Sequence, residues 1–143
     1  MKQSLLLFII VLLSTSFNIK KEEQILGEWL TGNKKAKIKI FTKNSKYYGV
    51  ISWLKEPLEK DGSAKKDKNN PVVTKQAQLI IGLELLRDFS YAGNNEWEDG
   101  YIYDPESGKT YSCNITLKPD GRTLDVRGYI GLSFIGRTDT WTK

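Results

Sequence analysis

The residues available for chemistry in this 143-residue chain are limited first by the complete absence of histidine. Without imidazole there is no Ser-His or Cys-His nucleophile, no histidine base and little basis for a zinc site. The remaining candidates for an acid–base pair or a calcium site are the carboxylates Glu96, Glu98, Asp99 and Asp104. Residues 94–100 lack the terminal glutamate of a calcium loop. We therefore interpret these carboxylates as a solvated strand edge, and expect no metal, no cofactor and no enzymatic activity.

Cys113 is the only cysteine, so an intramolecular disulfide is excluded. It alternates in phase with Tyr111, Ile115 and Leu117, which is the pattern of an inward-facing strand. The sequence therefore predicts a buried, inert thiol.

Aromatic side chains are the other distinctive group, with five Phe, four Trp and seven Tyr residues. Such residues suit core filling, which is the default, and equally apolar ligand binding and protein interfaces. Asp67 and Arg127 could orient the polar part of a ligand that sits beside them. We predict a site for a small hydrophobic or amphipathic ligand, formed by Trp53, Asp67, Trp97, Tyr103, Tyr111 and Arg127.

Strands must position these groups, because apolar and polar residues alternate along much of the chain. On the strand at 96–103 the alternation places Trp97, Asp99, Tyr101 and Tyr103 on one face. Residues 76–90 fit both a helical face and a strand, and a short helical turn before a strand stays open as an alternative. Strands are predicted at 25–30, 36–41, 46–54, 82–90, 96–103, 109–117, 122–130 and 133–142.

About eight strands joined mostly by short turns, without βαβ alternation, predict an all-β fold. The turns at 104–108 and 118–121 have the Pro, Asp and Gly residues of tight hairpins. Residues 25–143 are thus expected to form a single antiparallel up-and-down β-barrel, either filled or holding one small ligand. The exception is the irregular stretch 55–75, which is either functional or a solvated loop closed by an Asx turn. We expect the ligand at the rim where this stretch meets the aromatic strands.

The first sixteen residues have the pattern of a secretory signal peptide: Lys2, an apolar run over 5–13, and small residues up to Ser16. The run is too short to span a bilayer, for which about 20 residues are needed. A tether over 17–24 and a secreted or periplasmic protein are the expectation, with no membrane span after cleavage. The net charge of +5 would then fall to +4, and without a basic stripe we expect no nucleic-acid partner. The oligomeric state is not predicted.

Several motifs along the chain resemble an exported bacterial family, the domain of unknown function numbered 2147. That resemblance implies a lipocalin-like barrel, an exported location and no established activity. Asp139 departs from the family pattern, which has an amide there. The matching residues are Gly27-x-Trp29, Tyr48-Gly49, Asp67 with Asn70-Pro71, Gly82, Tyr103-Asp104-Pro105-x-Ser107-Gly108-Lys109-x-Tyr111, Leu124, Arg127-Gly128-Tyr129, Gly131, and Gly136-Arg137 with Trp141.

The first and last strands also resemble those of lipocalins proper, which share a Gly-x-Trp on the first strand and an arginine on the last. The resemblance implies that the arginine, here Arg137, lies over the ring of Trp29 at the closed end of the barrel. We accordingly assign Gly27, Trp29, Gly136, Arg137 and Trp141 to barrel closure.

Two other functions stay open. A protein-interaction or cell-envelope scaffold module would have a filled barrel, no ligand and an exposed aromatic patch. An enzyme would need converging carboxylates or a Tyr/Arg pair in a pocket.

Overall fold

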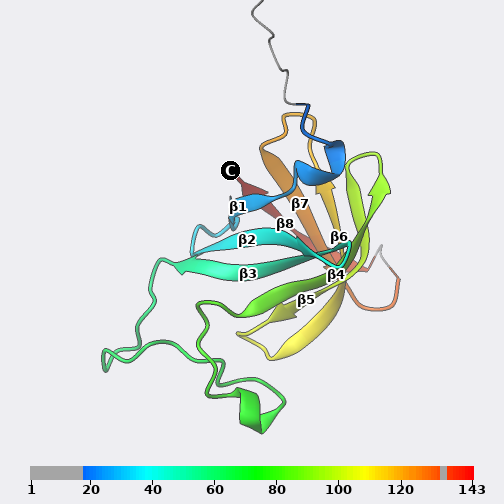
Figure 1. Ribbon diagram of the computed structural model, residues 1–143. Coiled ribbons are helices and arrows are strands. Elements are labelled where there is room, and N and C mark those ends of the chain that lie inside the picture. The colour runs from blue at the N-terminus through cyan, green and yellow to red at the C-terminus, as the bar shows by residue number, and fades with distance from the viewer. Residues whose placement is uncertain (1–17, 133–134) are drawn as a thin grey trace, which may run out of the picture.

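The computed structural model describes residues 18–132 and 135–143, and in them the chain forms a closed antiparallel barrel. Every strand pairs with its neighbours in sequence and the last pairs with the first, which confirms the predicted up-and-down topology (Figure 1). The predicted signal peptide lies outside the described residues. The strands are β1 (Gly27–Leu30), β2 (Ala36–Lys43), β3 (Lys46–Leu54), β4 (Glu84–Gly93), β5 (Glu96–Asp104), β6 (Lys109–Leu117), β7 (Thr123–Tyr129) and β8 (Gly136–Thr142).

The two ends of the barrel differ in what covers them. At one end a short 3-10 helix, η1 (Lys21–Glu23), precedes β1 and lies near the β2–β3 and β4–β5 hairpins (Figure 1). At the other end the 55–83 loop connects β3 to β4 and projects away from the barrel (Figure 1). This loop contains a second 3-10 turn, η2 (Val73–Lys75). The sequence of residues 76–90 fits both a helix and a strand. In the described chain, residues 76–83 form turns and bends, and strand β4 begins at Glu84.

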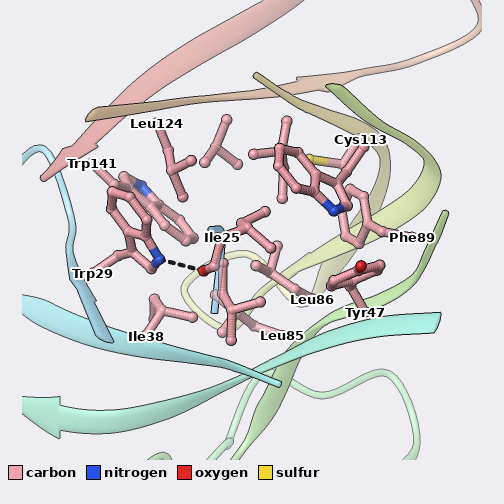
Figure 2. Close-up of a cluster of buried hydrophobic side chains, with 14 of the residues drawn as sticks. Ile25, Trp29, Ile38, Tyr47, Leu85, Leu86, Phe89, Cys113, Leu124 and Trp141 are labelled. Atoms are coloured by element: carbon pink, nitrogen blue, oxygen red, sulfur yellow. Dashed lines mark hydrogen bonds between the residues drawn. The ribbon is translucent and has the colours of Figure 1, made fainter. Parts of the chain in front are cut away.

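In the described part of the chain, a cluster of seventeen buried apolar side chains forms the core, which fills the barrel. Figure 2 shows Trp29 and Trp141 on one side of this core and Phe89, Cys113 and Tyr47 on the other. The indole N–H of Trp29 donates to the Ile25 carbonyl at 2.7 Å, so the segment before β1 is held across the core. The predicted alternation is confirmed along β2, β6 and most of β7, because these inward residues are buried: Ile38, Ile40, Cys113, Ile115, Leu117, Leu124 and Val126. The same alternation placed Ile130 inward, which is wrong: this residue lies beyond the end of β7 and is 70% exposed.

The prediction for β5 is wrong beyond Trp97, because a bulge reverses its phase. Asp99 adopts a left-handed backbone with φ of 60°, and the register against β6 shifts between Trp97 and Gly100. One extra residue moves every later side chain to the opposite face. Ile102 therefore packs against the core, whereas Tyr101 is 43% exposed.

The prediction that Arg137 covers the Trp29 ring is also wrong. Arg137 is the second residue of β8, where it is exposed and pairs with Gly128 of β7. The seam with β1 is at the other end of β8, where Thr142 pairs with Leu30. The cation over Trp29 is instead Lys143, whose Nζ lies 4.8 Å from the ring centroid. Gly136 likewise pairs with β7, opposite Tyr129, so neither residue reaches β1.

Asp139 completes this seam. Its Oδ2 accepts a hydrogen bond from the Trp141 indole at 2.7 Å and from the backbone N–H of Gly32 at 3.3 Å. Gly32 lies in the β1–β2 connection, and a Cβ there would overlap the Asp139 side chain. The carboxylate of Asp139 thus links strand β8 to the β1–β2 connection by a hydrogen bond. The sequence did not predict this role.

We expect the Cys113 thiol to be unreactive in the folded protein. Its side chain is fully buried, as predicted, and burial raises the pKa of the thiol to about 12. Because the thiolate is the reactive species, its reaction with a thiol reagent such as DTNB at mildly alkaline pH should be on the order of a thousandfold slower than for an ordinary cysteine. The same protein in denaturing urea is the control and should react fully. Rapid labelling of the native protein would contradict the burial of this strand face.

No helix in the described ranges is long and apolar enough to cross a membrane.

Candidate functional site

Three clusters of polar or aromatic side chains are candidate sites, and the first lies where the 55–83 loop meets β5. The carboxylate of Asp67 is fully buried and accepts two hydrogen bonds of 2.7 Å, from the Tyr103 hydroxyl and from the Asn70 amide. Its backbone N–H donates to the Gln78 carbonyl. Both carboxylate oxygens are therefore occupied by partners of the same chain. This geometry describes a structural clamp and leaves little capacity for a ligand.

The clamp extends to the β5–β6 hairpin. The Asn69 amide donates to the backbone carbonyls of Pro105 and Glu106, at 3.3 and 2.9 Å. Gly108, with φ of 70°, lies so close to the Asn69 carbonyl that a Cβ would overlap it. The motif residues around Asp67 and Gly108 are far apart in sequence, but both groups contribute contacts that hold the 55–83 loop against the barrel.

This clamp should weaken at alkaline pH. Burial, reinforced by the hydrogen bond and the charge of Asp67, raises the pKa of Tyr103 from 10.0 to about 12. A hydroxyl whose pKa is raised by folding stabilises the folded state below the unfolded pKa and loses that contribution as the pH rises through the folded one. Stability should therefore decline between pH 10 and 12, and Tyr103→Phe should decline less steeply, as measured by urea unfolding at a series of pH values.

Other groups also have raised pKa values, because burial raises those of Cys113 and Tyr47. They are present in both proteins, so the difference between wild type and Tyr103→Phe isolates Tyr103. Parallel pH profiles for the two proteins would show that the Tyr103–Asp67 bond does not contribute.

The second cluster lines a groove of about 270 Å³ on the outer face of strands β5 to β8. Arg127 lines it together with Glu96, Glu98 and Asp125, and donates to the Thr138 hydroxyl at 3.0 Å. Arg127 thus faces outward, and a mouth shared with Asp67 and the barrel aromatics, as the sequence analysis expected, is not formed. The carboxylates Glu96 and Glu98 lie on this face, as predicted for a charged strand edge.

The third cluster lines a larger concavity of about 480 Å³ at the η1 end of the barrel. Its apolar walls are Tyr47 of β3, Tyr91 of β4 and Leu26, and its rim carries Glu22 and Glu23 of η1. Tyr47 lies inside the barrel because it shares a face with the buried Ile51, and Tyr91 follows the bulge at Asp88. Thr42, Ser45 and Ser90 complete the lining. We call this concavity the η1 cleft.

Trp97 lies behind the two tyrosines of the η1 cleft. Its ring centroid is 5.0 Å from that of Tyr91 and 6.0 Å from that of Tyr47, the latter edge-on. Its indole N–H is buried and has no hydrogen-bond acceptor among the residues that the structure describes. Burial raises the pKa of the Tyr47 hydroxyl, and the nearby Trp97 N–H partly offsets that rise without completing a hydrogen bond. A buried donor without an acceptor costs about 1–3 kcal/mol, so such groups call for an explanation.

The six residues predicted to bind ligand therefore do not converge on one site. Trp97 is in the core behind the η1 cleft, Asp67 and Tyr103 form the clamp, and Arg127 lies in the outer groove. Trp53 is 41% exposed at the end of β3, with Lys37 Nζ 5.9 Å from its ring centroid. Tyr111 is half-buried on β6.

The sequence did not predict Tyr47 and Tyr91 as binding-site residues. In the strand at 46–54, bulky side chains alternate on both faces, so the pattern does not indicate which face is inward. The aromatic concavity accordingly lies at the end opposite the predicted rim. In the described part of the chain, no group of three or more Cys, Asp or Glu side chains is arranged to hold a metal.

A closed up-and-down barrel of eight antiparallel strands is the architecture of lipocalins, so the fold is a lipocalin-like barrel. The chain belongs to the DUF2147 family, described as uncharacterised proteins conserved in bacteria, whose model matches residues 27–143. Its structure is similar to that of a Helicobacter pylori protein described as belonging to the lipocalin family. The TM-score is 0.72 at 26% sequence identity, over 82% of this chain and 81% of that one. No curated protein matches the sequence.

Proposed function

We propose that this chain is a binding module for a small, partly apolar molecule, and that the η1 cleft is its site. The observation that carries the proposal is the buried, unpaired indole N–H of Trp97 directly behind the aromatic wall of the cleft. A ligand with a hydrogen-bond acceptor could satisfy that donor after a small movement of Tyr47. The ligand's apolar part would lie against Tyr91 and Leu26.

The volume and the chemistry of the cleft define the ligand class. About 480 Å³ lies within the range of small-molecule sites. Glu22 and Glu23 at the rim disfavour an anionic head group, since like charges repel. The proposed ligand is therefore an amphiphile without an anionic head group, and an uncharged one is the simplest case. Its site is confined to the end of the barrel, because tryptophan and phenylalanine side chains fill the interior.

The proposal is tested with the uncharged fluorescent probe N-phenyl-1-naphthylamine and the chain from Phe17 onward, which contains all eight strands and the whole core. Thr42→Trp fills the η1 cleft, and Thr138→Trp is the matched control in the outer groove. Both positions are exposed, so neither change should disturb folding. We expect the probe to bind the wild type and Thr138→Trp equally, and Thr42→Trp at least about tenfold more weakly.

Two outcomes would favour other functions. If the probe does not bind at all, the filled-barrel interaction module becomes the better reading. If only Thr138→Trp loses binding, the ligand site is the outer groove.

We further propose that the protein acts outside the cytoplasm, in the periplasm or medium. The pattern of residues 1–16 supports this. Fractionation of the producing bacterium, with N-terminal sequencing of the mature protein, tests it: export predicts a new N-terminus close to Phe17.

A further inference from the structure

The 55–83 loop exposes an unusual number of apolar side chains, at the end of the barrel opposite the η1 cleft (Figure 1). The most exposed is Val73 of η2, at 76%. Exposed apolar groups that gather on one part of a surface mark sites of interaction with proteins or membranes. The set, which we call the loop patch, consists of Leu58, Val72, Val73, Leu79 and Ile81.

Hydrogen bonds fix the loop patch in its outward position. The Val72 N–H donates to the Asn70 side chain at 2.9 Å, and Asn70 is itself bound to the buried Asp67. Leu79 is held by an antiparallel bridge to Lys66. Val72 and Leu79 are therefore held in place by bonds within the loop, and a partner need not first order these two positions.

The loop patch is accompanied by an excess of positive charge. Residues 55–83 contain six lysines and four carboxylates. One carboxylate, Asp67, is buried within the clamp, and another, Asp61, is bound by Ser63. Within the described ranges only Lys65 and Lys68 have ion-pair partners in the loop, Glu56 and Glu59. The lysines without an ion pair are Lys55, Lys60, Lys66 and Lys75.

We infer that the 55–83 loop docks on the surface of an anionic phospholipid bilayer. Apolar side chains interleaved with lysines match such a surface, because the former enter the boundary between head groups and acyl chains and the latter pair with the lipid phosphates. The rigid clamp holds the barrel at a fixed orientation, with the η1 cleft facing away from the membrane. This inference is independent of what the cleft binds.

The test is co-sedimentation of the chain from Phe17 onward with vesicles of phosphatidylcholine mixed with phosphatidylglycerol, and with vesicles of phosphatidylcholine alone. Val73→Asp removes the most exposed apolar contact, and Ile19→Asp, at a similarly exposed position before η1 at the opposite end of the barrel, is its matched control. The triple variant K60Q/K66Q/K75Q is matched by K20Q/K21Q/K39Q, which loses the same charge from exposed positions elsewhere.

We expect binding only to the vesicles with phosphatidylglycerol, weakened by high salt. Val73→Asp and the loop triple variant should each bind roughly tenfold or more weakly, while both controls bind as the wild type does. Three results would overturn the inference. These are no binding to the anionic vesicles, equal loss in both lysine triples, or a dimer by light scattering that Val73→Asp abolishes, since a second copy would then occupy the patch.

Discussion

Replacing Asp67 by alanine is expected to lower the free energy of unfolding by about 3 kcal/mol, because a buried and a half-buried donor both lose a charged acceptor and an unsatisfied group costs about 1–3 kcal/mol. The donors are the Tyr103 hydroxyl and the Asn70 amide, both 2.7 Å from the carboxylate. Urea unfolding followed by circular dichroism measures the effect. The loss should be accompanied by proteolytic cleavage within the 55–83 loop, since this carboxylate fastens that loop to β5.

Two further variants separate the clamp from a general effect of charge. Asp67→Asn can still accept from Asn70 and donate to the Tyr103 oxygen, so it should cost about 1 kcal/mol. Asp61→Ala removes an exposed carboxylate of the same loop that is bound to Ser63, and exposed polar groups of this kind contribute within about 0.5 kcal/mol. If Asp67→Ala unfolds at the wild-type urea concentration, the clamp is not what holds the loop.

Gly100→Ala is expected to have a comparable effect, about 3 kcal/mol, by overpacking the core. Gly100 lies just after the bulge of β5, and a Cβ there would overlap the ring of Phe89, which is almost fully buried on β4. The ring cannot withdraw, because the surrounding core is filled. The same urea titration measures the loss.

Gly128→Ala is the matched control for Gly100→Ala. Gly128 is also a strand glycine, but its added Cβ would meet Ile102 at 3.4 Å, an ordinary contact. Its cost should stay below about 1 kcal/mol. A second check is Phe89→Leu, which makes room: combined with Gly100→Ala it should cost less than the sum of the two single changes. Strict additivity would contradict the close packing of Gly100 and Phe89.

The class of fold could be predicted from the sequence because its signals are local. Alternation marked the inward faces of β2, β6 and β7, and the Pro, Asp and Gly residues of the hairpins at 104–108 and 118–121 marked their turns. Eight antiparallel strands that follow one another in sequence are compatible with only a few architectures. The core residues of these strands followed from the same pattern.

The candidate site could not be predicted, because it depends on bulges and on register. Asp88 and Asp99 take left-handed conformations inside strands, and each moves the residues after it to the other face. That shift separates Trp97, in the core, from Tyr101 and Tyr103 on the same strand. Neither the composition of these strands nor the spacing of their apolar residues indicates where a bulge adds an extra residue.

The seam of the barrel shows a similar limit. Arg137 and Lys143 are both cations near the end of the chain, and only the pairing of β8 with β1 decides which of them meets Trp29. That pairing is a tertiary contact between the first and the last strand, which are far apart in the sequence.

The central claim, that a small amphiphile occupies the η1 cleft, is tested most directly by the four tryptophan indole N–H resonances in a ¹H–¹⁵N correlation spectrum. These report different sites: Trp29 donates to Ile25, Trp141 donates to Asp139, Trp53 is exposed, and Trp97 has no acceptor. On titration with 1-decanol, whose oxygen can accept a hydrogen bond, the Trp97 resonance should move downfield and farther than the others, and Thr42→Trp should abolish the shift. A Trp97 resonance that stays in place while only that of Trp53 responds would contradict the claim.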